Sequence, residues 1–225
     1  NDVDNCPTGY EDLSCWNTGG VTDMKHAFQE QTGFNKPLEC WDTSQVTTMY
    51  GMFQAAKAFN GAIDGWNTSA VTLMQAMFSN AKAFNRAVDE WNTSAVKTME
   101  GMFNDADAFN QAIDGWDTSA VTNMKFMFLK ANVFNRAIAG WNTSAVRTMF
   151  GMFDRAGAFN QAVDGWDTSA VTTMEDMFNN AFNQCLSTWA EKTPDDVRTF
   201  NMLRNTDCPD KNDPSPIAGP WCQTP

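Results

Sequence analysis

The sequence predicts an α/β fold: a repeat solenoid of about eight 25-residue strand-turn-helix rungs with disulfide-stapled caps. Three observations predict it. Tryptophan recurs every 25 residues, each unit changes its apolar periodicity halfway along, and the six cysteines lie only near the two ends. The solenoid would span residues 16–189, between an N-terminal cap at 1–15 and a C-terminal cap and tail at 190–225. We call each rung a coil, and residues at equivalent places in successive coils a column.

The columns contain nearly all the large apolar residues. Thirteen of the 14 methionines fall on two columns, and 14 of the 17 phenylalanines fall on two more. A single unit is too small to bury a core of its own, so neighbouring coils must stack and share one. The column that sets the period consists of Trp16, Trp41, Trp66, Trp91, Trp116, Trp141 and Trp166, followed by Trp189 after 23 residues because one loop is shorter.

The unit at residues 58–80 shows the two halves of a coil. Its second half places Val71, Met74, Met77 and Phe78 at i, i+3, i+6 and i+7, which is one face of a helix. Side-chain oxygens at 67–69 can cap the first turn of that helix. The stretch at 59–66 is typical of a brief strand that ends in a turn. We therefore expect a short strand and a short amphipathic helix in every coil.

Two polar columns accompany the apolar ones. The asparagine after the second phenylalanine of each coil predicts a buried amide ladder that caps the backbone of the bend. The threonine before each predicted helix is interpreted as a cap rather than as part of a flat ice-binding array. The columns are Asn35, Asn60, Asn85, Asn110, Asn135, Asn160 and Asn183, and Thr18, Thr43, Thr68, Thr93, Thr118, Thr143 and Thr168.

A family resemblance rests on one repeated string. The string FNxAIDGWDTSAVTxMxxMF at residues 109–128, which recurs with small changes in every unit, closely resembles the mycoplasma-lipoprotein repeat, a BspA-like relative of the leucine-rich repeats. The resemblance covers roughly residues 16–189. It implies a leucine-rich-repeat-like α/β solenoid and a secreted or cell-surface protein concerned with adhesion or surface architecture. It brings no catalytic residues.

Composition excludes several classes of partner. With 15 Lys+Arg against 27 Asp+Glu, the net charge is −12, which disfavours nucleic acid. No apolar run approaches the ~18–20 residues of a membrane span. The chain begins at Asn1, and its cysteines are typical of an oxidising compartment. We expect a processed, secreted or cell-surface protein whose partner is a protein or glycan.

Candidate chemistry is sparse. His26 is the only histidine, and no cysteine or carboxylate stands near it at ligand spacing, so we expect neither a zinc site nor an enzyme. The tryptophan column predicts core packing, with a sugar-binding platform as the alternative. One acidic column could bind calcium, although solvated turns are the favoured interpretation because stacked like charges repel. It contains Asp64, Asp89, Asp114 and Asp164. No other cofactor is expected.

Two sets of surface residues are candidates for modification or binding. Asn67, Asn92 and Asn142 satisfy the N-glycosylation rule, whereas Asp42, Asp117 and Asp167 occupy the same column without it. Five apolar residues interrupt otherwise polar outward columns and are the candidates for a partner contact, with scattered exposed apolar residues as the alternative. They are Tyr50, Leu73, Phe126, Leu129 and Phe150.

The cysteines predict stapled ends. Cys15 and Cys40 precede repeat tryptophans in consecutive coils, about 5 Å apart, so we pair them. Cys185 and Cys208 would clamp the C-terminal cap. Cys6 and Cys222 remain, at opposite ends of the solenoid, and a bond from Cys222 to Cys6 of the next molecule would build a head-to-tail filament. A Cys6–Cys222 bond within one chain, or local Cys6–Cys15 and Cys208–Cys222 bonds, are the open alternatives.

The sequence thus predicts a non-enzymatic, extracellular or cell-surface binding and adhesion module. Two alternatives stay open: a structural protomer of a surface filament or coat, and a carbohydrate-binding surface protein.

Overall fold

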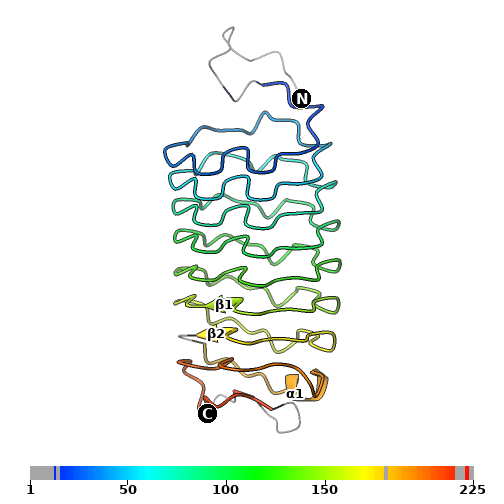
Figure 1. The fold of residues 1–225 in the computed structure, drawn as a ribbon, viewed down its shortest axis with the longest axis vertical. Helices are drawn as coiled ribbons and strands as arrows, with labels where there is room; N and C mark the ends of the chain where they lie inside the picture. Colours follow the sequence, from blue (N-terminus) through cyan, green and yellow to red (C-terminus); the bar gives the residue numbers. More distant parts are fainter. Residues whose placement is uncertain (1–12, 14–15, 180–181, 216–220, 223–225) are drawn as a thin grey trace.

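The computed structural model describes residue 13 and residues 16–179, 182–215 and 221–222. The chain winds into a long stack of similar coils, with the two ends of the chain at opposite ends of the stack (Figure 1). Seven parallel bridges connect equivalent residues of consecutive coils, so eight coils follow one another. The bridged column is Asp23, Thr48, Leu73, Thr98, Asn123, Thr148, Thr173 and Arg198. The predicted repeat stack is confirmed.

Regular secondary structure is sparse within the described ranges. It consists of strand β1 (Phe153–Asp154), strand β2 (Phe178–Asn179) and helix α1 (Trp189–Lys192). The two strands pair in parallel, with Phe153 opposite Phe178. The short strand and the short helix predicted in every coil are both wrong. Among the described residues, the segment at 59–66 and its equivalents contain no strand, and the segments that carry the helical apolar spacing are successions of tight turns.

The backbone hydrogen bonds explain why turns replace helices. Met52 N–H donates to the Met49 carbonyl three residues back, as in a β-turn. The intervening Gly51 N–H instead donates to the Gln75 carbonyl of the next coil, and the same alternation continues along the segment. An α-helix would use these amides within its own turn and leave none for the neighbouring coil. The turns therefore satisfy the backbone and bind the coils together at once.

Two positions in each turn segment require a left-handed backbone. The residue at position 26 of the first coil and its equivalents have φ between +51° and +60°, and those at position 30 have φ between +57° and +61°. Glycine takes this conformation without a steric cost, which accounts for Gly51, Gly101 and Gly151. These glycines are the sequence signal that contradicted a helix.

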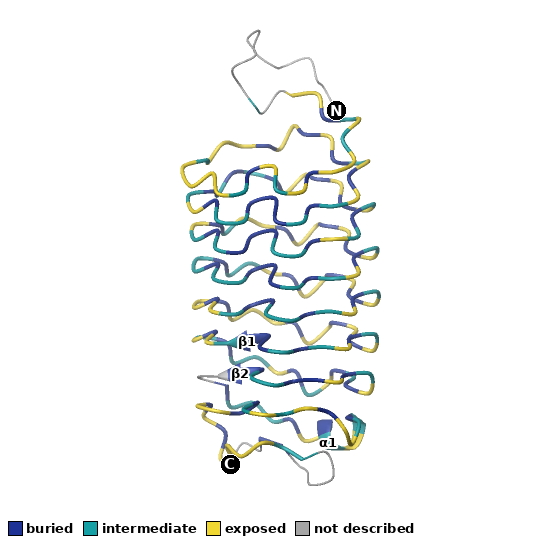
Figure 2. Cartoon of the chain, viewed as in Figure 1, coloured by how far each residue is buried: buried dark blue, intermediate teal, exposed yellow. Residues whose placement is uncertain are grey.

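Stacked aromatic rings fill the interior. Within one coil the Phe53 and Phe59 ring centroids lie 3.8 Å apart, and Phe53 stacks on Phe78 of the next coil at 5.7 Å. Trp66 stacks on Trp91 at 6.3 Å. The tryptophans from Trp41 to Trp189 are buried, which confirms the core interpretation, whereas Trp16 in the first coil is 53% exposed. Figure 2 shows buried residues recurring at the same places along successive coils.

Side chains also bond from coil to coil. The Thr43 hydroxyl donates to the Asn67 carbonyl at 2.9 Å, and the threonine column repeats this contact. The threonines therefore cap the backbone of the next coil, not a helix. The predicted asparagine ladder exists: Asn85 N–H donates to Asn60 Oδ1 at 3.0 Å, and other coils repeat it. Its side chains are half-buried or exposed, not buried as predicted.

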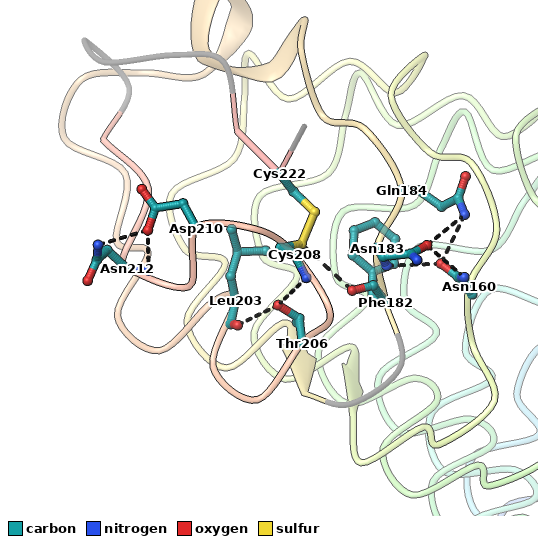
Figure 3. The surroundings of a disulfide bond; sticks show 10 residues. All are labelled: Asn160, Phe182, Asn183, Gln184, Leu203, Thr206, Cys208, Asp210, Asn212 and Cys222. Carbon is teal, nitrogen blue, oxygen red and sulfur yellow. Dashed lines mark hydrogen bonds between the residues drawn. A yellow bond between two sulfur atoms is a disulfide. The ribbon is translucent and has the colours of Figure 1, made fainter. Parts of the chain in front are cut away.

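The last part of the described chain closes the C-terminal end. Leu186 and Trp221 form an antiparallel bridge, and a disulfide joins Cys208 to Cys222, whose Cα atoms are 5.0 Å apart (Figure 3). The predicted Cys185–Cys208 bond is therefore wrong. Leu186 is buried against the returning chain, and its neighbour Cys185 is half-buried with a free thiol. Successive residues of extended chain point to opposite sides, so only one of the two can face this closure.

Candidate functional site

The turn segments present one continuous outer surface, which we call the turn face. It consists of the side chains at positions 23, 25, 26, 29 and 30 of the first coil and their equivalents in later coils. The structure brings all five partner-contact candidates to this face, although on turns and not on helices. Leu73 is 37% exposed, and Tyr50, Phe126, Leu129 and Phe150 are half-buried.

One cluster of aromatic and basic side chains lies near the N-terminal end of the turn face. The His26 and Tyr50 rings meet edge to face, with centroids 4.7 Å apart and planes at 61°. Lys25 Nζ lies 5.0 Å from the centre of the Tyr50 ring. A Cβ on Gly51 would come within 2.5 Å of His26 Nδ1, so the glycine leaves the room that the imidazole fills.

A second cluster repeats this arrangement four coils further along. The Phe126 and Phe150 rings meet edge to face at 5.0 Å and 70°, and Lys125 Nζ lies 4.9 Å from the first ring and 5.4 Å from the second. A Cβ on Gly151 would come within 2.6 Å of the Phe126 ring. At about 4.8 Å per coil, the two clusters are about 19 Å apart.

The sequence interpretation missed the lysines and His26 as members of this surface. The signal was present, because Lys25-His26 and Tyr50-Gly51 stand at the same places as Lys125-Phe126 and Phe150-Gly151. A lysine and a ring in one coil are followed, 25 residues later, by a ring and a glycine. When the columns of positions 25 and 26 are compared in adjacent coils, these motifs predict two equivalent contacts in which a ring covers a glycine of the next coil.

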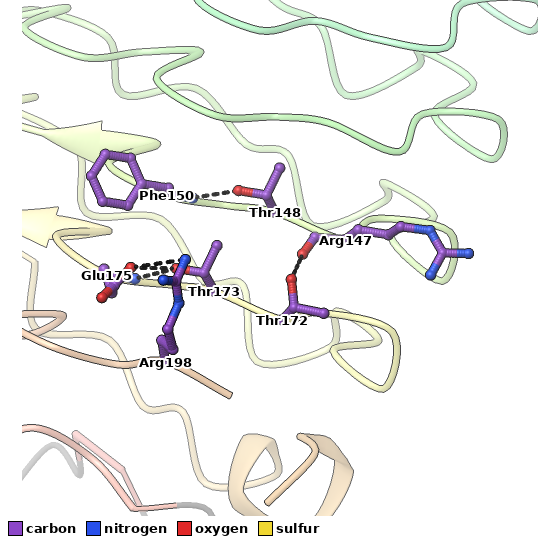
Figure 4. A network of polar contacts seen from close by, with 7 residues as sticks. All are labelled: Arg147, Thr148, Phe150, Thr172, Thr173, Glu175 and Arg198. Atoms are coloured by element: carbon purple, nitrogen blue, oxygen red, sulfur yellow. Dashed lines mark hydrogen bonds and ion pairs between the residues drawn. The ribbon is translucent and has the colours of Figure 1, made fainter. Parts of the chain in front are cut away.

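Polar contacts order the rest of the face (Figure 4). Arg198 Nη2 lies 3.3 Å from Glu175 Oε2, which also accepts a hydrogen bond from the Thr173 hydroxyl. In the middle of the face, Asn123 Nδ2 donates to Glu100 Oε2 at 2.9 Å. The contacts of Arg198 with Glu175 and of Asn123 with Glu100 lie between neighbouring coils and hold the charged groups in register.

The predicted glycosylation candidates are placed at the surface. Asn67, Asn92 and Asn142 are exposed, and each accepts the backbone N–H of the serine two residues on. The aspartates of this column make the same turn, so Asp117 Oδ1 accepts the Ser119 N–H at 2.9 Å. Hydrogen bonds from the serines lower the pKa of Asp42, Asp117 and Asp167 below its ordinary value.

Two of the four aspartates of the acidic column accept backbone N–H groups of the next coil. Asp64 and Asp89 are exposed, Asp114 accepts the Gly140 N–H at 3.0 Å, and Asp164 accepts the Thr188 N–H at 2.9 Å. Among the residues that the structure describes, no three His, Cys, Asp or Glu side chains gather closely enough to hold a metal ion. Within the same residues, no helix has the length and apolarity to cross a membrane.

The other cysteine predictions concern Cys40 and Cys222. Cys40 carries a free, exposed thiol, and its predicted partner Cys15 lies, like Cys6, outside the described residues. Cys222 is bonded within its own chain. The covalent head-to-tail filament through Cys222 is therefore wrong, because its returning tail meets Cys208 locally.

Comparison with known proteins gives one match. The family model described as "Mycoplasma protein of unknown function, DUF285" matches residues 2–116 and 106–212. No curated protein and no solved structure matches the chain. The two matched segments cover most of the chain and all eight coils, so this protein belongs to the DUF285 mycoplasma repeat family.

Proposed function

We propose that this protein is a non-catalytic binding and adhesion module, secreted or held at a cell surface, and that the turn face is its recognition surface. The observation that carries the proposal is the pair of equivalent clusters formed by Lys25, His26 and Tyr50 and by Lys125, Phe126 and Phe150. Partly exposed rings beside basic groups are typical of surfaces that recognise a macromolecule.

Three further considerations support the proposal. The resemblance to BspA-like repeats implies a surface protein, and the DUF285 match covers the same coils. The Cys208–Cys222 disulfide suits an oxidising compartment. Similar coils also provide similar environments, whereas acid–base catalysis needs two groups whose environments separate their pKa values.

The two alternatives have less support. A carbohydrate-binding protein would have to use the rings of the turn face, because the tryptophans from Trp41 to Trp189 are buried. A filament or coat protomer would have to assemble without a bond through Cys222.

The experiment compares binding by the wild type and a turn-face variant, Tyr50→Ala with Phe150→Ala, on a glycan array and a panel of extracellular matrix proteins. The matched control is Asp64→Ala with Asp89→Ala, at exposed positions outside the turn face. We expect the turn-face variant to lose at least tenfold in affinity for whatever the wild type binds, and the control to retain it. Wild-type binding that survives the turn-face substitutions would overturn the proposal, as would a wild type that binds neither these panels nor a second copy of itself.

A further inference from the structure

The charges on the turn face nearly balance, with seven acidic and six basic side chains, although the chain as a whole carries −12. In the columns of positions 23 and 25 there are three acidic and three basic side chains, so their sum is zero. They are Asp23, Glu100 and Glu175, and Lys25, Lys125 and Arg198. Two copies of such a chain repel one another over most of their surface. The turn face is where that repulsion is locally absent.

Two adjacent coils at the centre of the stack carry opposite charges. The fourth coil presents Glu100 and Asp105, and the fifth presents Lys125 and Lys130 in the same two columns. Thr98 and Asn123, two residues before the first charge in each coil, are bridged to one another. An acidic coil therefore lies directly beside a basic coil, halfway along the stack of eight.

We propose that the partner of the turn face is a second copy of this chain, packed face to face and antiparallel. The two-fold axis lies in the plane of the interface, perpendicular to the stacking direction, and passes between the fourth and fifth coils. This inference rests on the proposed function, because it names the partner of the same surface. The symmetry places each column against the same column of the second copy, in reversed order.

The reversed order opposes opposite charges at the centre of the face and at its two ends. Glu100 meets Lys125 of the second copy, and Asp105 meets Lys130. The outer coils follow the same rule, with Asp23 against Arg198 and Lys25 against the 62% exposed ring of Phe200. No two like charges are opposed in the columns of positions 23 and 25.

The neighbouring registers fail this test. Sliding the second copy by one coil moves the axis onto the fourth or the fifth coil. Glu100 would then face Glu100, or Lys125 would face Lys125. Directly opposed like charges are destabilising, so the charge pattern selects one register.

Shape supports the same register. A Cβ on Gly101 would meet only Asn104 Cβ, at 3.9 Å, so this glycine lies open, whereas Gly51 and Gly151 are covered by rings of their own chain. The proposed two-fold places Phe126 of the second copy over Gly101. The uncovered glycine of the column is thus opposite a half-buried aromatic ring.

The area is adequate for a modest dimer. Eight coils at about 4.8 Å each give a face about 38 Å long, and the six-residue step from position 23 to 29 is at most about 20 Å wide. This patch approaches the ~800 Å² per partner of an ordinary specific interface. Because the contact is two-fold, it closes on itself and yields a dimer, not a filament.

Sedimentation velocity across micromolar to millimolar concentrations tests the inference. We expect the wild type to dimerise, and Glu100→Lys alone and Lys125→Glu alone each to weaken dimerisation at least tenfold. An equimolar mixture of these two single variants should form a heterodimer, because each charge again faces its opposite. Asp64→Lys, which makes the same change of charge outside the turn face, should dimerise as the wild type does.

Three results would overturn the inference: a wild type that stays monomeric, a dimer that both charge reversals leave intact, or variants that stay monomeric when mixed. Thermal midpoints of every variant separate loss of association from loss of folding. A monomeric wild type that still loses array binding on Tyr50→Ala with Phe150→Ala would exclude the second copy as partner and leave the proposed function standing.

Discussion

The turn face and the opposite part of each coil stack by different means. On the turn face, the bonds between coils are mostly backbone to backbone, as from Gly51 N–H to the Gln75 carbonyl. In the part that carries the threonine, tryptophan and asparagine columns, which we call the ladder side, many are made by side chains. There the Thr43 hydroxyl and the Trp66 indole N–H each donate to a carbonyl of a neighbouring coil, both at 2.9 Å.

The difference explains which columns are constant along the chain. A side chain that itself bonds a neighbouring coil cannot change without leaving a backbone carbonyl or N–H of that coil unpaired, so the ladder side repeats nearly unchanged. The turn face is held by its backbone, so its outward side chains are free to vary, from Tyr50 to Glu100 to Phe150 in one column. Constancy here indicates a structural bond, and variation marks the surface available for recognition.

The largest loss of stability is expected from a substitution in the buried core of the ladder side. Trp116 is 3% exposed, and its indole N–H donates to the Val88 carbonyl at 2.8 Å. Trp116→Ala should lower the free energy of unfolding by about 3–5 kcal/mol, because it opens a cavity and removes that bond. Trp16→Ala, in the same column but 53% exposed, is the control and should cost much less. Urea unfolding measures both, and equal losses would contradict the distinction between the first coil and the rest.

The next effect tests the glycines of the turn face. Gly151→Ala should cost about 2–4 kcal/mol, since a left-handed backbone penalises a side chain by about 1–2 kcal/mol and the added methyl also meets the Phe126 ring. Gly101→Ala shares the backbone conformation but has open space, so about 1–2 kcal/mol is expected. The difference between the two variants, measured by thermal unfolding, isolates the ring contact. It should vanish when Phe126→Ala is added to both.

A smaller effect is expected when threonine is replaced by valine in each of the two regions. The buried Thr118 hydroxyl donates to the Asn142 carbonyl, whereas the half-buried Thr148 hydroxyl accepts a 3.3 Å bond from the Phe150 N–H. Thr118→Val should cost about 1–3 kcal/mol because it strands a carbonyl. Thr148→Val should stay within about 0.5 kcal/mol, since water can replace its contact. If Thr148→Val were the more damaging, side-chain bonds would hold the turn face as well.

The periodicity sufficed to predict the stack and its core. Identical residues every 25 positions can share a continuous core only if the coils superimpose, and the buried Trp and Phe columns follow from that. The helices could not be predicted correctly from apolar spacing alone. Turns with bonds to the third residue back direct Met74, Met77 and Phe78 inward as a helix would.

The sequence predicted the single residues of the candidate site but not the contacts that they make between coils. The five apolar interruptions were visible one residue at a time, and the structure places all of them on the turn face. The clusters join Lys25 and His26 to Tyr50 of the next coil, a contact that depends on how the coils superimpose. The repeat pattern could not predict the C-terminal disulfide, because no periodicity relates Cys208 to Cys222.

The smallest expected effect is on the stability of the protein at acid pH. Asparagine and aspartate alternate irregularly in one column of the ladder side, and both accept the same backbone N–H: Asn67 from Ser69, and Asp117 from Ser119. At neutral pH we therefore expect Asp117→Asn, combined with the same change at Asp42 and Asp167, to leave stability nearly unchanged. Hydrogen bonds from serine lower the pKa of these three carboxyls in the folded protein.

A folded pKa below the unfolded value of about 3.9 stabilises the protein above that pH, and the contribution is lost as the pH falls through the lowered pKa. The triple variant should therefore lose less stability than the wild type below about pH 4. The three carboxyls lie near the surface, so solvent screening keeps the difference small. Urea unfolding midpoints collected from neutral to acid pH measure it. Parallel curves for the two proteins would show that the serine bonds do not distinguish the charged from the neutral side chain.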